Sequence, residues 1–110
     1  MKDENSGPFV GVMVVEIRIH NSFSLKDRRQ IVRSLLEKTR SRINVSVADL
    51  GPDSSHQDAR LAFSVVSSSH ASATERLDSV EKLIGSVENG GEFFVVRETR
   101  EVERNAGFPY

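Results

Sequence analysis

Residues 24 to 42 read SLKDRRQIVRSLLEKTRSR, and their pattern is typical of an amphipathic helix. Ser24 is a residue type that caps helices, and an acid follows three positions later at Asp27, as in a capping box. The expected apolar face is about 140° wide and consists of Leu25, Ile31, Val32, Leu35, Leu36 and Thr39. We therefore predict a helix that begins near Leu25 and packs this face on a sheet.

Four strand patterns and a second helix pattern surround this stretch. The predicted strands, rich in β-branched and alternating apolar residues, are 9–20, 43–48, 60–66 and 93–102. The second helix takes its N-cap from the serines at 67–69 and ends at the Asn-Gly-Gly of 89–91. Gly85 in its interior costs about 1 kcal/mol relative to alanine, which suits a place where the helix closely approaches another backbone.

The order strand, helix, strand, strand, helix, strand predicts an α+β, ferredoxin-like βαββαβ fold. Right-handed crossovers place both helices on one face of a four-stranded antiparallel sheet of order 4-1-3-2. We expect one domain over 9–103, a flexible N-terminal tail over 1–8 and a C-terminal tail over 104–110. In this topology His20, Lys26 and His56 meet at one edge of the sheet, and His70 lies at the opposite edge.

Composition narrows the possible functions. The chain has no apolar run near the roughly 20 residues that span a bilayer, and residues 1–8 lack the pattern of a signal peptide, so we expect a cytoplasmic protein with no membrane partner. It has no cysteine, and its three histidines show no metal-binding spacing, so we expect neither metal nor cofactor. No phosphate-binding glycine loop or catalytic constellation is present, so we do not expect an enzyme.

The predicted first helix is strongly basic. It carries a net charge of +5 in a chain whose net charge is −1. On a helical wheel Lys26, Arg29, Arg33 and Arg40 form a stripe roughly 21 Å long, which suits the phosphates of RNA or of a ribosomal particle. The alternative is a solvated helix flank whose long side chains cover the edge of the core. Arg28 instead points into the apolar face, so we expect it to snorkel or to form a structural ion pair.

The face of the sheet without helices is not cleanly polar. Val10, Val12 and Val14 alternate with Met13 and Val15, so the first strand is apolar on both faces. We expect a homo-oligomer, most simply a dimer, that buries Val10, Val12, Val14, Phe94 and Val96. The C-terminal aromatic residues Phe108 and Tyr110 could cover this face instead. Base stacking by Phe63 and Phe93 or Phe94 is a weaker interpretation than packing in a core or an interface.

Two motifs resemble a known family. The motifs are SLKDRR at 24–29 and NVSVA at 44–48, within a similarity over most of residues 9–102. They resemble the small, uncharacterised bacterial YlxP-like family, and the resemblance implies a ferredoxin-like fold and no established enzymatic activity. It also implies genes often found among those for translation and ribosome maturation, and no agreed catalytic residues. The polar N-terminal extension and the Gly51-Pro52 loop depart from the family pattern.

Our leading interpretation is thus a non-enzymatic RNA- or ribosome-associated factor, and the alternative is an oligomeric protein–protein interaction module.

Overall fold

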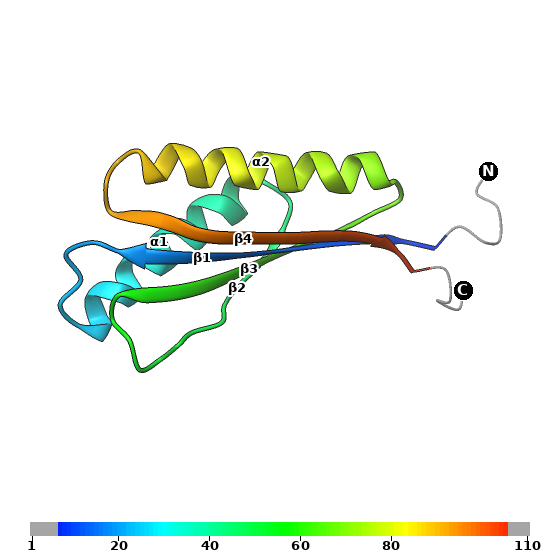
Figure 1. The fold of residues 1–110 in the computed structure, drawn as a ribbon. Coiled ribbons are helices and arrows are strands. Elements are labelled where there is room, and N and C mark those ends of the chain that lie inside the picture. The colour runs from blue at the N-terminus through cyan, green and yellow to red at the C-terminus, as the bar shows by residue number, and fades with distance from the viewer. Residues whose placement is uncertain (1–6, 106–110) are drawn as a thin grey trace.

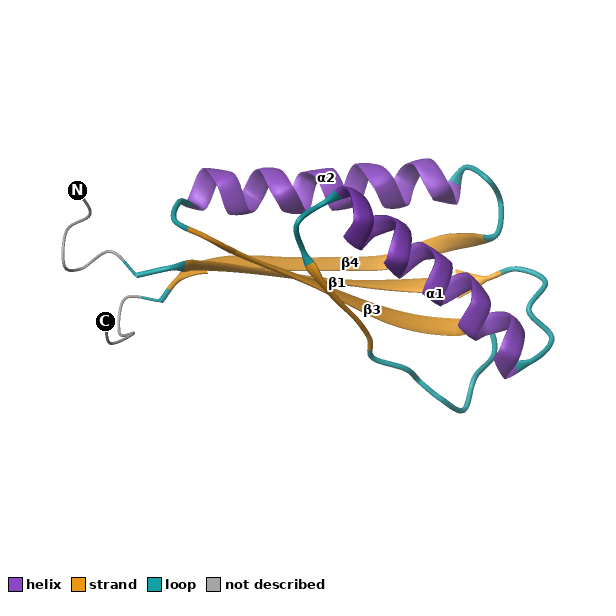
Figure 2. Cartoon of the chain, turned by 180° about the vertical axis from the view of Figure 1, so that it is seen from behind, coloured by secondary structure: helices purple, strands orange, loops and turns teal. Residues whose placement is uncertain are grey.

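The computed structural model of the chain describes residues 7–105. Its elements, in chain order, are β1 (Phe9–Ile19), α1 (Leu25–Arg42), β2 (Ser46–Asp49), β3 (Asp58–Ser67), α2 (His70–Glu88) and β4 (Phe93–Arg104). The strands form one antiparallel sheet of order β2-β3-β1-β4, which is the predicted order 4-1-3-2 read from the other edge. Both helices lie against the same face of this sheet (Figures 1 and 2). The predicted ferredoxin-like fold is therefore confirmed.

Alternation along β1 decides which face is the core. Met13, Val15, Ile17 and Ile19 are buried toward the helices, whereas Val12 and Arg18, which point the opposite way, are exposed. Buried residues of β3 and α2 complete this single core, among them Leu61, Phe63, Leu77 and Val80. At Gly11 a Cβ atom would lie 2.9 Å from Val65 Cγ2 and 3.0 Å from Leu77 Cδ1 of α2, so a larger residue there would force these side chains to shift.

Several strand boundaries differ from those predicted. Ile43 does not begin β2, because it caps α1 and donates its backbone N–H to the carbonyl oxygen of Thr39 at 2.9 Å. β2 consequently runs only from Ser46 to Asp49. β1 stops at Ile19, one residue short of the prediction. β3 and β4 end later than predicted because β1 pairs with both of them as far as Phe9, and β3 starts earlier because Arg18 pairs with Asp58.

The tails predicted at 1–8 and 104–110 fall mostly on residues 1–6 and 106–110, which lie outside the described residues, as do Phe108 and Tyr110. Within the described part, β4 extends to Arg104, and the Asn105 N–H donates to the carbonyl oxygen of Pro8 at 2.8 Å. Among residues 7–105, no helix combines the length and the apolar character needed to cross a membrane.

Candidate functional site

The N-terminus of α1 is fixed by the predicted capping box. The Ser24 hydroxyl accepts the backbone N–H of Asp27 at 3.0 Å, and the Asp27 carboxylate accepts the backbone N–H of Phe23 at 3.1 Å. The first bond satisfies an N–H group that a helix start otherwise leaves unpaired, whereas the second ties down the residue before the N-cap rather than the N-cap itself. Asp27 also places a negative charge at the positive end of the helix dipole. The start of α1 is thus held rigidly although three cations lie in its first turns.

Arg28 is the one basic residue of α1 that is buried, with 2% of its surface exposed. Its guanidinium donates two hydrogen bonds to the Asp49 carboxylate, at 2.9 and 3.0 Å, and a third to the carbonyl oxygen of Asp58 at 2.8 Å. The hydrogen bond from Arg28 lowers the pKa of Asp49 below its ordinary value, and the same bond raises the pKa of Arg28. Arg28 therefore forms the predicted structural ion pair and ties α1 to the end of β2.

Asp49 was missed by the sequence analysis, which ended the second strand one residue earlier. The signal was present, because Val45, Val47 and Asp49 alternate and share the helix-covered face. In the structure Val47 and Asp49 pair with Phe63 and Leu61 of β3, both of which are fully buried. An acid at an inward-facing position predicts a buried cation as its partner.

Three of the four predicted phosphate-binding residues line one groove. Arg29, Arg33 and Arg40 line an open cavity of about 280 Å³ between α1 and β2. Leu36 and Val47 are its apolar neighbours, and the acids Glu37 and Asp49 also line it. Lys26 is exposed on the same helix but does not line the groove. None of the four side chains makes a hydrogen bond or ion pair with another part of residues 7–105. Their charges are therefore available to an external anion.

An exposed aromatic residue precedes this basic helix. The Phe23 side chain is 79% exposed, although its backbone is held by Asp27 and the preceding Ser22 is fully buried. The sequence analysis did not single it out, although its place three residues before Lys26 was the available signal. Of the aromatic residues that it considered for stacking, Phe63 and Phe93 are buried in the core, whereas Phe94 is 42% exposed on the open face of the sheet.

The three histidines make separate contacts. His20 stacks on Phe94 with ring centroids 5.3 Å apart, and His56 Nδ1 lies 2.7 Å from the carbonyl oxygen of Ser22. His70 meets the ring of Phe9 edge-on at the far end of β1. Across residues 7–105, no group of three histidine or carboxylate side chains is arranged to hold a metal ion.

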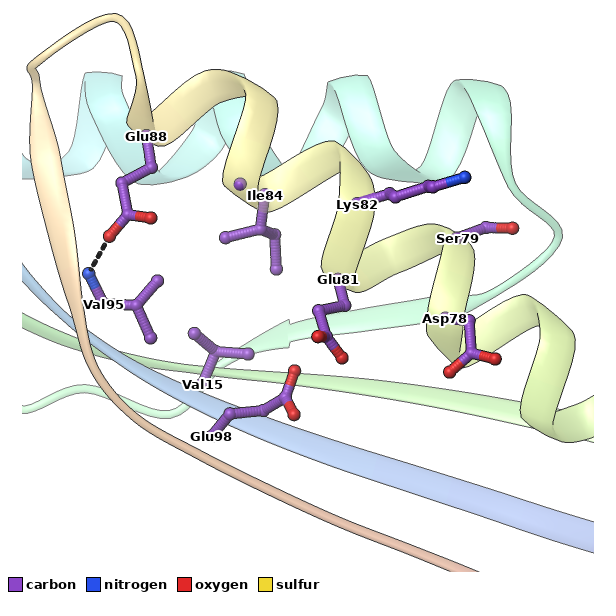
Figure 3. Close-up of a pocket in the computed structure, with 10 residues that line it drawn as sticks. Val15, Asp78, Ser79, Glu81, Lys82, Ile84, Glu88, Val95 and Glu98 are labelled. Carbon is purple, nitrogen blue, oxygen red and sulfur yellow. Dashed lines mark hydrogen bonds between the residues drawn. The ribbon is translucent and has the colours of Figure 1, made fainter.

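A second cavity, of about 730 Å³, lies between α2 and β4, and its lining combines acids with apolar residues and Lys82 (Figure 3). Asp78, Glu81, Glu88 and Glu98 line it, and the Glu88 carboxylate accepts the backbone N–H of Val95 at 2.6 Å. Gly85 opens onto this cavity, and a Cβ atom there would meet nothing within 4 Å. The expectation of a close backbone approach at Gly85 was therefore wrong.

Lys82 also lines this cavity, and Arg100 of β4 pairs with three of its carboxylates. The Arg100 guanidinium pairs with Asp78 at 2.7 Å, with Glu81, and with Glu98 at 3.5 Å. Burial acts to lower the pKa of Arg100, but the carboxylates outweigh burial and raise it. The side chains of Arg100 and Glu98 thus face α2 and bind β4 to that helix.

The predicted oligomer-interface residues lie on the sheet face opposite the helices. Val12 is 42% exposed, Phe94 42% and Val96 60%, whereas Val10 and Val14 are half-buried. Phe94 stands opposite Arg18 of β1, and Val96 is the additional residue of a bulge between the Ile17–Val95 and Glu16–Arg97 pairs. Within residues 7–105, no helix covers this open face (Figure 2).

Comparison with known proteins agrees with the family resemblance found in the sequence. Residues 10–97 match the family described as "Protein of unknown function (DUF503)". The chain is also 27% identical over 77 residues to the uncharacterized protein YlxP of Bacillus subtilis (strain 168), and this match covers 70% of the chain and 84% of that protein. The family match takes in most of the fold, from β1 into β4, which confirms the resemblance found in the sequence. The chain therefore belongs to the DUF503 family, as a YlxP-like protein.

Proposed function

We propose that the protein binds RNA, free or within a ribosomal particle, through the groove formed by α1 and β2. The observation that carries the proposal is the convergence of Arg29, Arg33 and Arg40 on one groove, where none of them forms an ion pair within residues 7–105, although Glu37 and Asp49 also line the groove. Structural arginines are normally paired, as Arg28 and Arg100 are in this chain. Three unpaired guanidinium groups on one helix face suit successive phosphates, because arginine binds phosphate oxygens through two parallel hydrogen bonds.

The chemistry of the groove favours contact with the nucleic-acid backbone. Arginine–phosphate contacts release counterions, so affinity should fall steeply with salt and depend little on base sequence. Lys26 extends the basic surface toward the start of α1. Phe23 adds an exposed ring there, and such a ring can stack on an unpaired base. We therefore expect single-stranded RNA to bind better than a duplex of the same length.

Charge reversal tests this proposal. The variant Arg29→Glu/Arg33→Glu/Arg40→Glu should bind a fluorescent single-stranded RNA at least about tenfold more weakly at low salt, and log K should fall less steeply with log salt. The matched control is Lys38→Glu/Arg42→Glu/Lys82→Glu, because these cations also lack an ion pair within the described chain and lie outside the groove. Fluorescence anisotropy measures the affinity for free RNA, and co-sedimentation with ribosomes tests whether the protein binds the ribosomal particle.

Two results would reject the proposal. One is a parent protein that binds neither RNA nor ribosomes at low salt. The other is an equal loss of binding in the groove variant and in its control, because that loss would reflect net charge alone.

The second candidate function is a protein–protein interaction module that uses the open sheet face. The exposure of Val12, Phe94 and Val96 favours it, since large apolar side chains on an uncovered face mark contact surfaces. Val12→Ser/Phe94→Ser should then weaken self-association measured by sedimentation velocity, while RNA binding stays unchanged. Unaltered self-association in this variant would argue against the open face.

A further inference from the structure

β4 is a long strand at the edge of the sheet. Within residues 7–105 it pairs only with β1, and most of its 12 residues are exposed. The Glu88 carboxylate occupies the edge at Val95, beside the bulge. From Arg97 to Glu103 the register with β1 is regular. No side chain of the described chain bonds the backbone N–H groups of this segment that point away from β1. This part of the edge is therefore open to another strand.

The charges on this open edge are antisymmetric. Residues 97–101 read RETRE. Arg97 and Glu101 lie two residues before and after Thr99, and Glu98 and Arg100 lie one residue before and after it. When a strand pairs antiparallel with its own copy about a twofold axis, residues equally far from the axis on opposite sides face each other. With the axis at Thr99, Arg97 meets the partner's Glu101, and Glu98 meets the partner's Arg100. Each of these charges then meets its opposite.

The pleat of the strand agrees with this register. Arg97 and Glu101 stand opposite Glu16 and Val12 of β1, on the open face, whereas Glu98 and Arg100 face α2. Directly opposed residues share a face, so the Thr99 axis matches open-face residues with each other and helix-side residues with each other. An axis at Glu98 or at Arg100 would instead set two like charges against each other.

In a single copy of the chain, the carboxylate of Glu101 has no cation opposite it on β1. The β1 residues opposite Glu101 and Glu103 are Val12 and Val10, and the hydrogen bond and charge of Glu103 raise the pKa of Glu101. The Arg97 side chain is 73% exposed, and among residues 7–105 its only ion-pair partner is Glu16, at 3.5 Å. The partner's Arg97 would bring to Glu101 the cation that β1 does not supply.

We propose that two copies of this chain associate by antiparallel pairing of their β4 strands about a twofold axis at Thr99, which joins the two sheets into one of eight strands. The surface is the sheet edge, so the proposal is independent of RNA binding by the α1 groove and differs from contact through the open face. The bulge at Val96 limits the regular pairing to a short segment on each strand, so we expect moderate affinity that weakens with salt.

A charge swap tests the register. Arg97→Glu and Glu101→Arg should each raise the dimer dissociation constant about tenfold or more, since each places like charges opposite each other twice per dimer. The double variant Arg97→Glu/Glu101→Arg restores opposite charges and should return the constant to within about threefold of the parent value. Sedimentation velocity measures the constants, and circular dichroism verifies that each variant is folded. A monomeric parent at high concentration, or a double variant weaker than both single variants, would overturn the proposal.

Cross-linking tests the axis directly. The chain has no cysteine, so Thr99→Cys introduces the only thiol. Directly opposed Cβ atoms lie about 4.5–5.5 Å apart, and mild oxidation should therefore give a covalent dimer. In the control Glu103→Cys the two thiols would be roughly 27 Å apart along the paired strands and should not cross-link. If Val12→Cys cross-links efficiently and Thr99→Cys does not, the dimer forms through the open face of the sheet, and the proposed pairing of the β4 strands is refuted.

Discussion

Replacing Asp49 by alanine removes the carboxylate that pairs with the buried Arg28. The guanidinium then keeps one of its three hydrogen bonds, the bond to the carbonyl oxygen of Asp58. Because only 2% of the Arg28 surface is exposed, water has little access to the guanidinium. Asp49→Ala therefore leaves a positive charge in the core without its counter-charge.

The expected loss of stability follows from the burial of the two partners. Removing one partner of a fully buried ion pair costs about 3–5 kcal/mol. The Asp49 side chain is one third exposed, so water can occupy part of the space it leaves. We therefore expect Asp49→Ala to lower the free energy of unfolding by about 2–3 kcal/mol, which corresponds to a fall in Tm of roughly 10–20 °C for a domain of this size.

The pair also determines part of the pH dependence of stability. Arg28 lowers the pKa of Asp49 in the folded chain, so the folded state holds this proton less tightly than the unfolded state, where the pKa is about 3.9. The contribution of the pair is complete above that pKa and is lost as the pH falls toward the folded-state pKa. The stability difference between the parent and Asp49→Asn should therefore shrink as the pH falls from 6 to 3.

Urea unfolding followed by circular dichroism measures both effects. The matched control is Arg28→Met/Asp49→Leu, which removes both charges and should lie within about 1.5 kcal/mol of the parent, because an apolar pair can replace a buried ion pair. A loss below about 1 kcal/mol for Asp49→Ala, or a double variant less stable than Asp49→Ala, would refute the view that Arg28 needs a counter-charge in the core.

Three further substitutions test the packing and the helix ends by the same unfolding assay. Ser24→Ala removes the N-cap of α1 and should cost about 1 kcal/mol; an unchanged unfolding midpoint would mean that the capping bonds add nothing. Gly85→Ala should stabilise α2 by about 0.5–1 kcal/mol, because the added methyl group meets only open space; destabilisation would show that the cavity is closed. Gly11→Ala should destabilise by about 1–3 kcal/mol through the 2.9 Å approach to Val65, and a neutral result would contradict that contact.

Local patterns along the chain account for the elements and for the basic helix. The capping box at Ser24 and the alternation of Met13, Val15 and Ile17 depend on neighbours within a few residues, so they can be recognised without the fold. The strand order could be predicted from the order of the elements along the chain, because right-handed crossover connections allow few arrangements of the strands in the sheet. The inward direction of Arg28 was likewise visible on a helical wheel.

Residues distant in the sequence determine the rest. The partner of Arg28 is Asp49, 21 positions away, and only the packing of α1 on β2 brings the two together. The same packing turns the predicted basic stripe into a groove of three arginines and leaves Lys26 outside it. Gly85 opens onto a cavity because β4 lies beside α2, which no local pattern reveals. The amphipathic sequence at 24–42 thus specifies a helix and its two faces, whereas tertiary contacts decide which of its charges are neutralised inside the protein and which remain available to a partner.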